Sequence, residues 1–126
     1  MKSLFTFIFI CLSLSATAQP KYNTNLLDTL DLIAHSTTPA RHFAKLYYRV
    51  IEITNAFADT FSENDKQFIF GFESYFGPAF FRSYKNYITK QPQEFSWQRY
   101  YADSTMNELQ YQFTGMNAHI NGDMWR

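Results

Sequence analysis

The chain of 126 residues has little cysteine, glycine or proline, and it has no excess of charge of either sign. Its one cysteine, Cys11, lies in an apolar segment near the start, so the sequence after it carries no thiol. Disulfides, thiolate metal sites and cysteine nucleophiles are therefore excluded from that part. Four glycines and four prolines are too few for disorder or for a turn-rich β fold.

The balance of positive and negative charge argues against strongly anionic partners. Eleven lysine and arginine residues stand against eleven aspartate and glutamate residues, and no run of like charge occurs. Nucleic acids and anionic membrane surfaces attract proteins through excess positive charge. We therefore expect neither as a partner.

The first residues have the pattern of a signal peptide. Lys2 supplies a positive charge, Leu4–Leu14 is apolar, and Ala16–Ala18 is a small-residue cleavage site. The apolar segment is shorter than the roughly 20 residues of a membrane-spanning helix, although an uncleaved anchor is the alternative. We expect a signal peptide over residues 1–18 and a secreted or periplasmic location, with no transmembrane segment after cleavage. Residues 19–126 then form a single domain.

Aromatic and aliphatic residues are abundant and recur at helical spacing. Aromatic residues make up 20% of the chain. Apolar residues lie three or four positions apart over about residues 26–34, 39–61 and 62–88 and from 103 or 104 onward, with a short aromatic segment at 95–101. The sequence therefore predicts an all-α fold, an irregular helical bundle of about four to five helices.

Local signals mark where some of these helices begin and bend. Thr38 and Pro39 are typical of the first positions of a helix, and Ser62 with Asp65 resembles a capping box. Pro78 lies inside a predicted helix, where a proline removes one backbone hydrogen bond and clashes with the preceding turn. We therefore expect a kink or a break at Pro78.

The last predicted helix has one apolar face. This face consists of Met106, Leu109, Phe113, Met116, Ile120 and Met124, which follow a 3.6-residue period. The period predicts that this face is buried. The pattern still runs at the last residues, and no helix-stop residue follows Met124. We therefore expect an incomplete domain, truncated at its C-terminal end.

Polar residues border this apolar face on both sides. At about 100° per residue, Gln112, His119 and Asp123 lie to one side of Ile120. On the other side lie Asn117 and Asn121. Burying polar groups is costly unless they have hydrogen-bond partners, so we expect a polar pocket with partners from other helices or from a ligand.

Two of these residues are candidates for chemistry. His119 and Asp123 stand four positions apart, which places both side chains on one helix face. They are candidate catalytic residues and candidate ligands of a divalent metal such as zinc, while Asn117, Asn121 and Gln112 are candidate substrate-binding residues. A plain hydrogen bond between the pair is the alternative, because zinc requires three or four ligands. His42 is a further candidate for the same pocket.

The segment Gly115–Asp123 also resembles a known signature. Its residues read Gly-Met-Asn-Ala-His-Ile-Asn-x-Asp, which is similar to the signature of domain-of-unknown-function family 5995. Phe43, Ala44 and Tyr47 with Thr54 resemble an early helix of that family, and Phe95 with Trp97 resembles its aromatic connection. The resemblance implies an all-α fold and a shared site around His119, but no established activity.

Two positions depart from the family pattern. Gly122 stands where the family has histidine or tyrosine, and Met124 stands where it has leucine. If the family residue at 122 lines a pocket, Gly122 leaves a hole there. The family also continues for several helices beyond this segment, which agrees with the expectation of a truncated member.

Three functions stay open at this point. The first is hydrolysis assisted by a metal or by His119, with Asp123 as a second ligand or as the group that orients the histidine. The second is a non-catalytic module that binds an apolar or lipid-like ligand. The third is a structural hydrogen-bond network without a ligand.

Overall fold

The computed structural model describes residues 22–125, and over that range it contains α-helices and two short 3-10 helices but no strand. The helices are α2 Thr24–Ala34, α3 Ala40–Phe57, α4 Glu63–Ile88, α5 Phe95–Ala102 and α6 Glu108–Gly122, with single 3-10 turns at Ala58–Thr60 and Asp123–Trp125. The all-α prediction and the expected number of helices are confirmed. The expected signal peptide, residues 1–18, lies outside the described residues.

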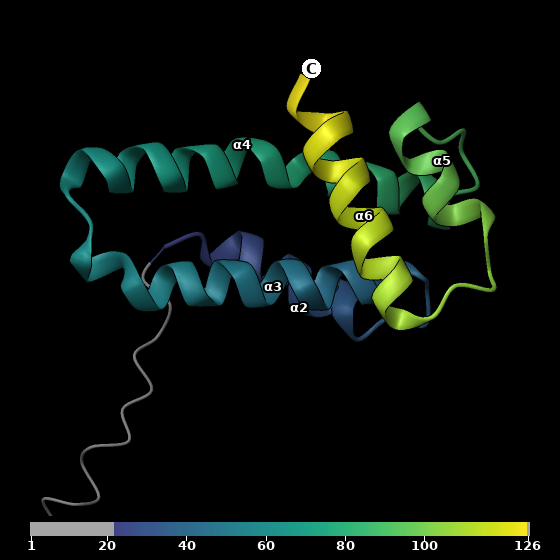
Figure 1. Cartoon of the computed structure of the whole chain (residues 1–126), viewed down its shortest axis with the longest axis horizontal. Helices are drawn as coiled ribbons and strands as arrows, with labels where there is room; N and C mark the ends of the chain where they lie inside the picture. Colours follow the sequence, from purple (N-terminus) through teal and green to yellow (C-terminus); the bar gives the residue numbers. More distant parts are fainter. Residues whose placement is uncertain (1–21, 126) are drawn as a thin grey trace, which may run out of the picture.

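A helical hairpin forms the frame of the molecule. Helices α3 and α4 run antiparallel and are joined at one end, α2 lies along α3, and α6 crosses both arms of the hairpin (Figure 1). Helix α5 packs against α6. Among the residues from 22 to 125, no helix is both long enough and apolar enough to cross a membrane.

The closed part of the core lies where α2, α3, α4 and α5 meet. Leu30, Phe80, Trp97 and Tyr100 are completely buried there. The ring of Phe43 meets that of Phe80 edge to face, with ring centroids 5.0 Å apart. This geometry is favourable for aromatic pairs, and it uses the aromatic surplus of the sequence for packing.

Of the local predictions about α4, the cap at Ser62 is confirmed, whereas the helix continues through Pro78 without a break. Ser62 caps the helix as predicted, because its hydroxyl accepts a hydrogen bond from the backbone N–H of Asp65. The helix does not break at Pro78. A proline costs one backbone hydrogen bond, whereas the turns on either side of it bury Phe76, Gly77 and Phe80 against other helices. The packing therefore outweighs the lost bond.

Helix α6 begins later than predicted. Residues 103–105 form a turn, because the Asp103 carboxylate accepts hydrogen bonds from the backbone N–H and the hydroxyl of Thr105. The helix starts after Asn107, which forms a reciprocal capping box with Gln110. The predicted start at residue 103 or 104 was therefore wrong, although Asn107 and Gln110 have the spacing of such a box in the sequence.

The predicted buried face of α6 is wrong for four of its six residues, whereas Met106 and Met116 pack partly buried against the core. Leu109, Phe113, Ile120 and Met124 are between 44% and 59% exposed. The helix instead buries Tyr111, Gly115, Ala118 and His119. At Gly115 a Cβ atom would lie 2.7 Å from Cγ of Phe43, so only glycine permits α6 to approach α3 this closely. Small residues therefore select the buried face, and the larger apolar residues lie on the open side.

Candidate functional site

A cleft of about 390 Å³ opens where α6 crosses the α3–α4 hairpin. This volume falls in the range of roughly 300–1,000 Å³ that is typical of small-molecule sites. Its walls are mainly apolar and come from all three helices: Leu46, Val50, Phe68, Phe72, Phe76, Met116, Ile120 and Met124. Two of the partly exposed apolar residues, Ile120 and Met124, therefore form one wall of the cleft together with Met116.

His119 lies in the lining of this cleft and is held by two residues behind it. The Nδ1 atom of His119 is 2.9 Å from Oδ2 of Asp123. The indole N–H of Trp97 donates to both carboxylate oxygens of Asp123, at 3.2 and 3.1 Å. A carboxylate only accepts, so Nδ1 of His119 carries a proton. In the neutral imidazole the other nitrogen, Nε2, then presents a lone pair.

The imidazole ring packs against several aromatic side chains. Phe76 stacks on it with ring centroids 3.7 Å apart, and Tyr47 and Phe43 lie at 4.9 and 5.5 Å. The side chain is only 3% exposed, and among the described residues Nε2 has no hydrogen-bond partner. Since a buried polar atom usually has a partner, this nitrogen is the first indication of a ligand.

Tyr47 and Glu73 add two more polar groups to the same cleft. Both side chains are 7% exposed, and within the described part of the chain the Tyr47 hydroxyl has no hydrogen-bond partner. Burial raises the pKa of Tyr47, and the carboxylates of Glu73 and Asp123 raise it further. The side chain therefore stays a neutral phenol, which can donate or accept a hydrogen bond.

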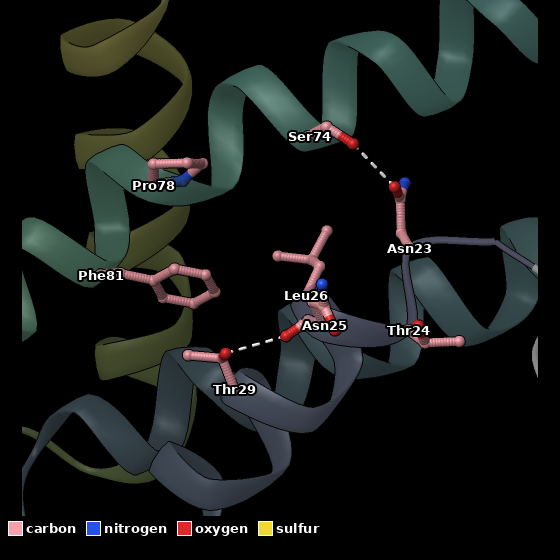
Figure 2. A pocket seen from close by; sticks show the side chains of 8 residues that line it. All are labelled: Asn23, Thr24, Asn25, Leu26, Thr29, Ser74, Pro78 and Phe81. Carbon is pink, nitrogen blue, oxygen red and sulfur yellow. Dashed lines mark hydrogen bonds between the residues drawn. The ribbon is translucent and has the colours of Figure 1, made fainter.

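Glu73 is held from the other side of α4 by Asn23. The Asn23 amide donates to Oε2 of Glu73 at 2.7 Å, and its carbonyl oxygen accepts from the Ser74 hydroxyl at 2.7 Å (Figure 2). Asn23 has a positive φ of 51°, which asparagine adopts more readily than most residues. Burial raises the pKa of the Glu73 carboxyl, while hydrogen bonds from Asn23 and Thr54 oppose this shift.

The two polar rows that border the apolar face of α6 lie in different surroundings in the structure. His119 and Asp123 are buried, whereas Asn117 and Asn121 are exposed and hydrogen-bonded to each other at 2.7 Å. The two asparagines line another hollow, between α5 and α6. Gln112 is half-buried and lines neither the cleft nor this hollow. The cleft therefore contains only part of the predicted pocket.

The other histidines do not join His119. His42 stacks on Tyr111 with ring centroids 5.0 Å apart and does not line the cleft. His35 is exposed and hydrogen-bonds to the backbone oxygen of Asp31. Within residues 22–125, no three His, Cys, Asp or Glu side chains are grouped so that they could hold a metal ion. His119 and Asp123 therefore lack the third ligand that zinc requires.

Gly122 has a different role from the one inferred from the family pattern. A Cβ atom at this position would lie 2.1 Å from Cβ of Ser96. The position of such a Cβ atom is therefore occupied by Ser96 of α5, and Gly122 lines the edge of the hollow between α5 and α6. This close approach brings α5, and with it Trp97, against the end of α6 that carries Asp123.

The sequence revealed the pair of His119 and Asp123 but not the groups around it. Trp97 and Tyr47 were named for their resemblance to the family's aromatic connection and early helix, and neither was placed beside His119. Glu73 had a usable signal, because it lies three and seven positions before the buried residues Phe76 and Phe80. A carboxylate on a buried helix face is uncommon without a partner, so this spacing pointed to a polar contact in the core.

The comparisons with known proteins identify the family. The model of a family of unknown function (DUF5995) matches residues 24–125, which include all five helices and the whole cleft. No curated protein and no solved structure matches the chain. With a match over most of its length, the chain belongs to this family of unknown function.

Proposed function

We propose that the chain binds an amphiphilic small molecule in the cleft between α3, α4 and α6. The observation that carries this proposal is the combination of apolar walls with two buried polar atoms, Nε2 of His119 and the Tyr47 hydroxyl, that have no partner among the described residues. The apolar part of the ligand packs against the walls, and its polar end hydrogen-bonds to these atoms. Ligand sites commonly combine apolar walls with a few polar groups in this way.

A series of straight-chain alcohols tests the proposal. Each methylene group that enters an apolar site contributes about 0.8 kcal/mol, which is roughly fourfold in affinity. We expect butanol, hexanol and octanol to bind with affinities that rise by about this factor per carbon until the cleft is full. Isothermal titration calorimetry on the folded protein measures the series. If no alcohol binds saturably, the proposal is wrong.

Two substitutions on α6 locate the binding. Ile120 lines the cleft, whereas Leu109 is on the same helix, is also more than two-fifths exposed, and lies outside it. We expect Ile120→Gln to weaken octanol binding at least about tenfold, because it places an amide against the alkyl chain. Leu109→Gln keeps the wild-type affinity. Equal effects of the two substitutions would place the ligand elsewhere.

Hydrolysis is the second candidate, and one observation favours it. Asp123 and Trp97 hold His119 so that Nε2 can accept a proton, which is what a general base requires. For an ester, Nε2 removes a proton from water as the water oxygen bonds to the carbonyl carbon. The alcohol then leaves with its bonding electrons and takes that proton. Tyr47 can donate to the carbonyl oxygen. No metal takes part in this scheme.

The rate of ester hydrolysis decides this candidate. General-base catalysis contributes about 10²–10⁴-fold to a rate. We expect His119→Gln to lower kcat for p-nitrophenyl octanoate at least about 100-fold. His42→Gln is the matched control, since His42 stacks on Tyr111 outside the cleft. Hydrolysis at the same rate by both variants withdraws this candidate and leaves ligand binding as the function.

We also propose that the protein is exported, to the periplasm or to the outside of the cell. The support is the charge, apolar segment and small-residue site within residues 1–18. N-terminal sequencing of the protein recovered from its native host should begin at Gln19. Recovery of the intact Met1 end would contradict export with cleavage.

A further inference from the structure

The charge around the cleft has one sign only. No lysine or arginine is among the described residues that line it, whereas Glu73 does line it. Asp123 lies directly behind His119, and its carboxylate also raises the pKa of Tyr47. Both acids therefore act on the same small volume, and no lysine or arginine of the described lining balances them.

The polar atoms of the cleft mainly accept hydrogen bonds. With Nδ1 directed at the Asp123 carboxylate, the neutral form of the imidazole presents a lone pair at Nε2. The carboxylate of Glu73 likewise accepts hydrogen bonds and donates none, and its Oε2 already accepts one from the Asn23 amide. The Tyr47 hydroxyl can do either. A head group that suits these three positions is one that donates several hydrogen bonds.

The apolar lining near these acceptors is aromatic. Phe72 and Phe76 lie with ring centroids 5.0 Å apart, and Phe76 stacks on the His119 ring at 3.7 Å. Both phenylalanines and Tyr47 line the cleft. The faces of such rings attract cations through the negative charge density of their π systems. The aromatic walls therefore favour a cationic head group, and such a group can also donate several hydrogen bonds to the acceptors.

We infer that the ligand is a primary alkylamine, a molecule with an ammonium head and an alkyl tail. This inference rests on the proposed function. The ammonium group has three N–H donors for His119, Tyr47 and Glu73 and a positive charge beside the carboxylate. The tail lies against the apolar walls. A fatty carboxylate or an alkyl phosphate of the same length would meet Glu73 with like charge and would find no basic partner in the lining.

Three compounds of equal chain length test the head group. Octylamine, octanol and octanoate are titrated separately into the folded full-length protein at neutral pH, and calorimetry gives each dissociation constant. We expect octylamine to bind about tenfold more tightly than octanol and at least about 100-fold more tightly than octanoate. If octanol or octanoate binds as tightly as octylamine, the inference is overturned, although an amphiphile site still exists. If none of the three binds, the proposed function itself has failed.

A variant of Glu73 separates charge from shape. Glu73→Gln keeps an oxygen that can accept from Asn23 but removes the negative charge. We expect octylamine to lose most of its advantage over octanol. Glu52→Gln is the matched control, because Glu52 is exposed on α3 and does not line the cleft. An unchanged preference for octylamine in Glu73→Gln would overturn the role of this carboxylate, and equal losses in both variants would mean that only overall charge matters.

Discussion

At the scale of single residues, the two tryptophans of the chain have opposite environments. Trp97 is completely buried and donates to Asp123, whereas Trp125 is 82% exposed. Trp97 also orders His119 indirectly, because it occupies both oxygens of the carboxylate that holds the imidazole. The same substitution at these two positions should therefore have very different effects on stability.

We expect Trp97→Phe to lower the free energy of unfolding by about 2–4 kcal/mol. A hydrogen bond to a charged group contributes about 1.5–3 kcal/mol, and the smaller ring also loses packing contacts. Trp125→Phe should change the value by less than about 0.5 kcal/mol, as is usual at exposed positions. Urea unfolding followed by circular dichroism gives both values. Similar midpoints for the two variants would show that the indole hydrogen bond contributes little.

At the scale of the helices, glycine decides how closely they approach. Gly115 of α6 lies against the ring of Phe43, whereas a Cβ atom added at Gly71 of α4 would meet no atom of another element within 4 Å. Both residues lie inside helices, where alanine is favoured over glycine by about 1 kcal/mol. The intrinsic preference is therefore the same at the two positions, and only the surroundings differ.

We expect Gly71→Ala to raise the free energy of unfolding by about 0.5–1 kcal/mol and Gly115→Ala to lower it. At Gly115 the new carbon would come within 2.7 Å of Phe43, so α6 must move away and lose contacts, typically at a cost of about 1–3 kcal/mol. Thermal and urea unfolding of the two variants test the opposite signs. A gain at both positions would mean that α6 does not lie this close to α3.

The helices also show what the sequence can and cannot predict. Periodicity found α2, α3, α4 and α6, because the spacing of apolar residues is a local property, whereas α5 was noted only as a short aromatic segment. Periodicity failed on the buried side of α6, where Gly115 and Ala118 face the core and Phe113 does not. Helix approach depends on the partner helix, which no local pattern contains. For the same reason the spacing of His119 and Asp123 revealed that pair, while Trp97 and Glu73, on other helices, were not placed beside it.

At the scale of the whole molecule, the apolar residues divide between a closed core and an open side. Phe80 is completely buried where α3, α4 and α5 meet, with Phe43 and Trp97 around it. Phe113 belongs to the apolar face of α6 and is 58% exposed. From the sequence alone the two phenylalanines are equivalent members of periodic helices. In the folded molecule they differ in how much apolar surface they remove from water.

We expect Phe80→Ala to lower the free energy of unfolding by about 3–5 kcal/mol, because it opens a cavity in the closed core. Phe113→Ala removes a side chain that already faces water over most of its surface, so its effect should be below about 1 kcal/mol. Guanidinium unfolding compares the two variants, and the affinity for octanol should be unchanged in Phe113→Ala because this residue does not line the cleft. Equal losses of stability would mean that Phe113 is covered in solution.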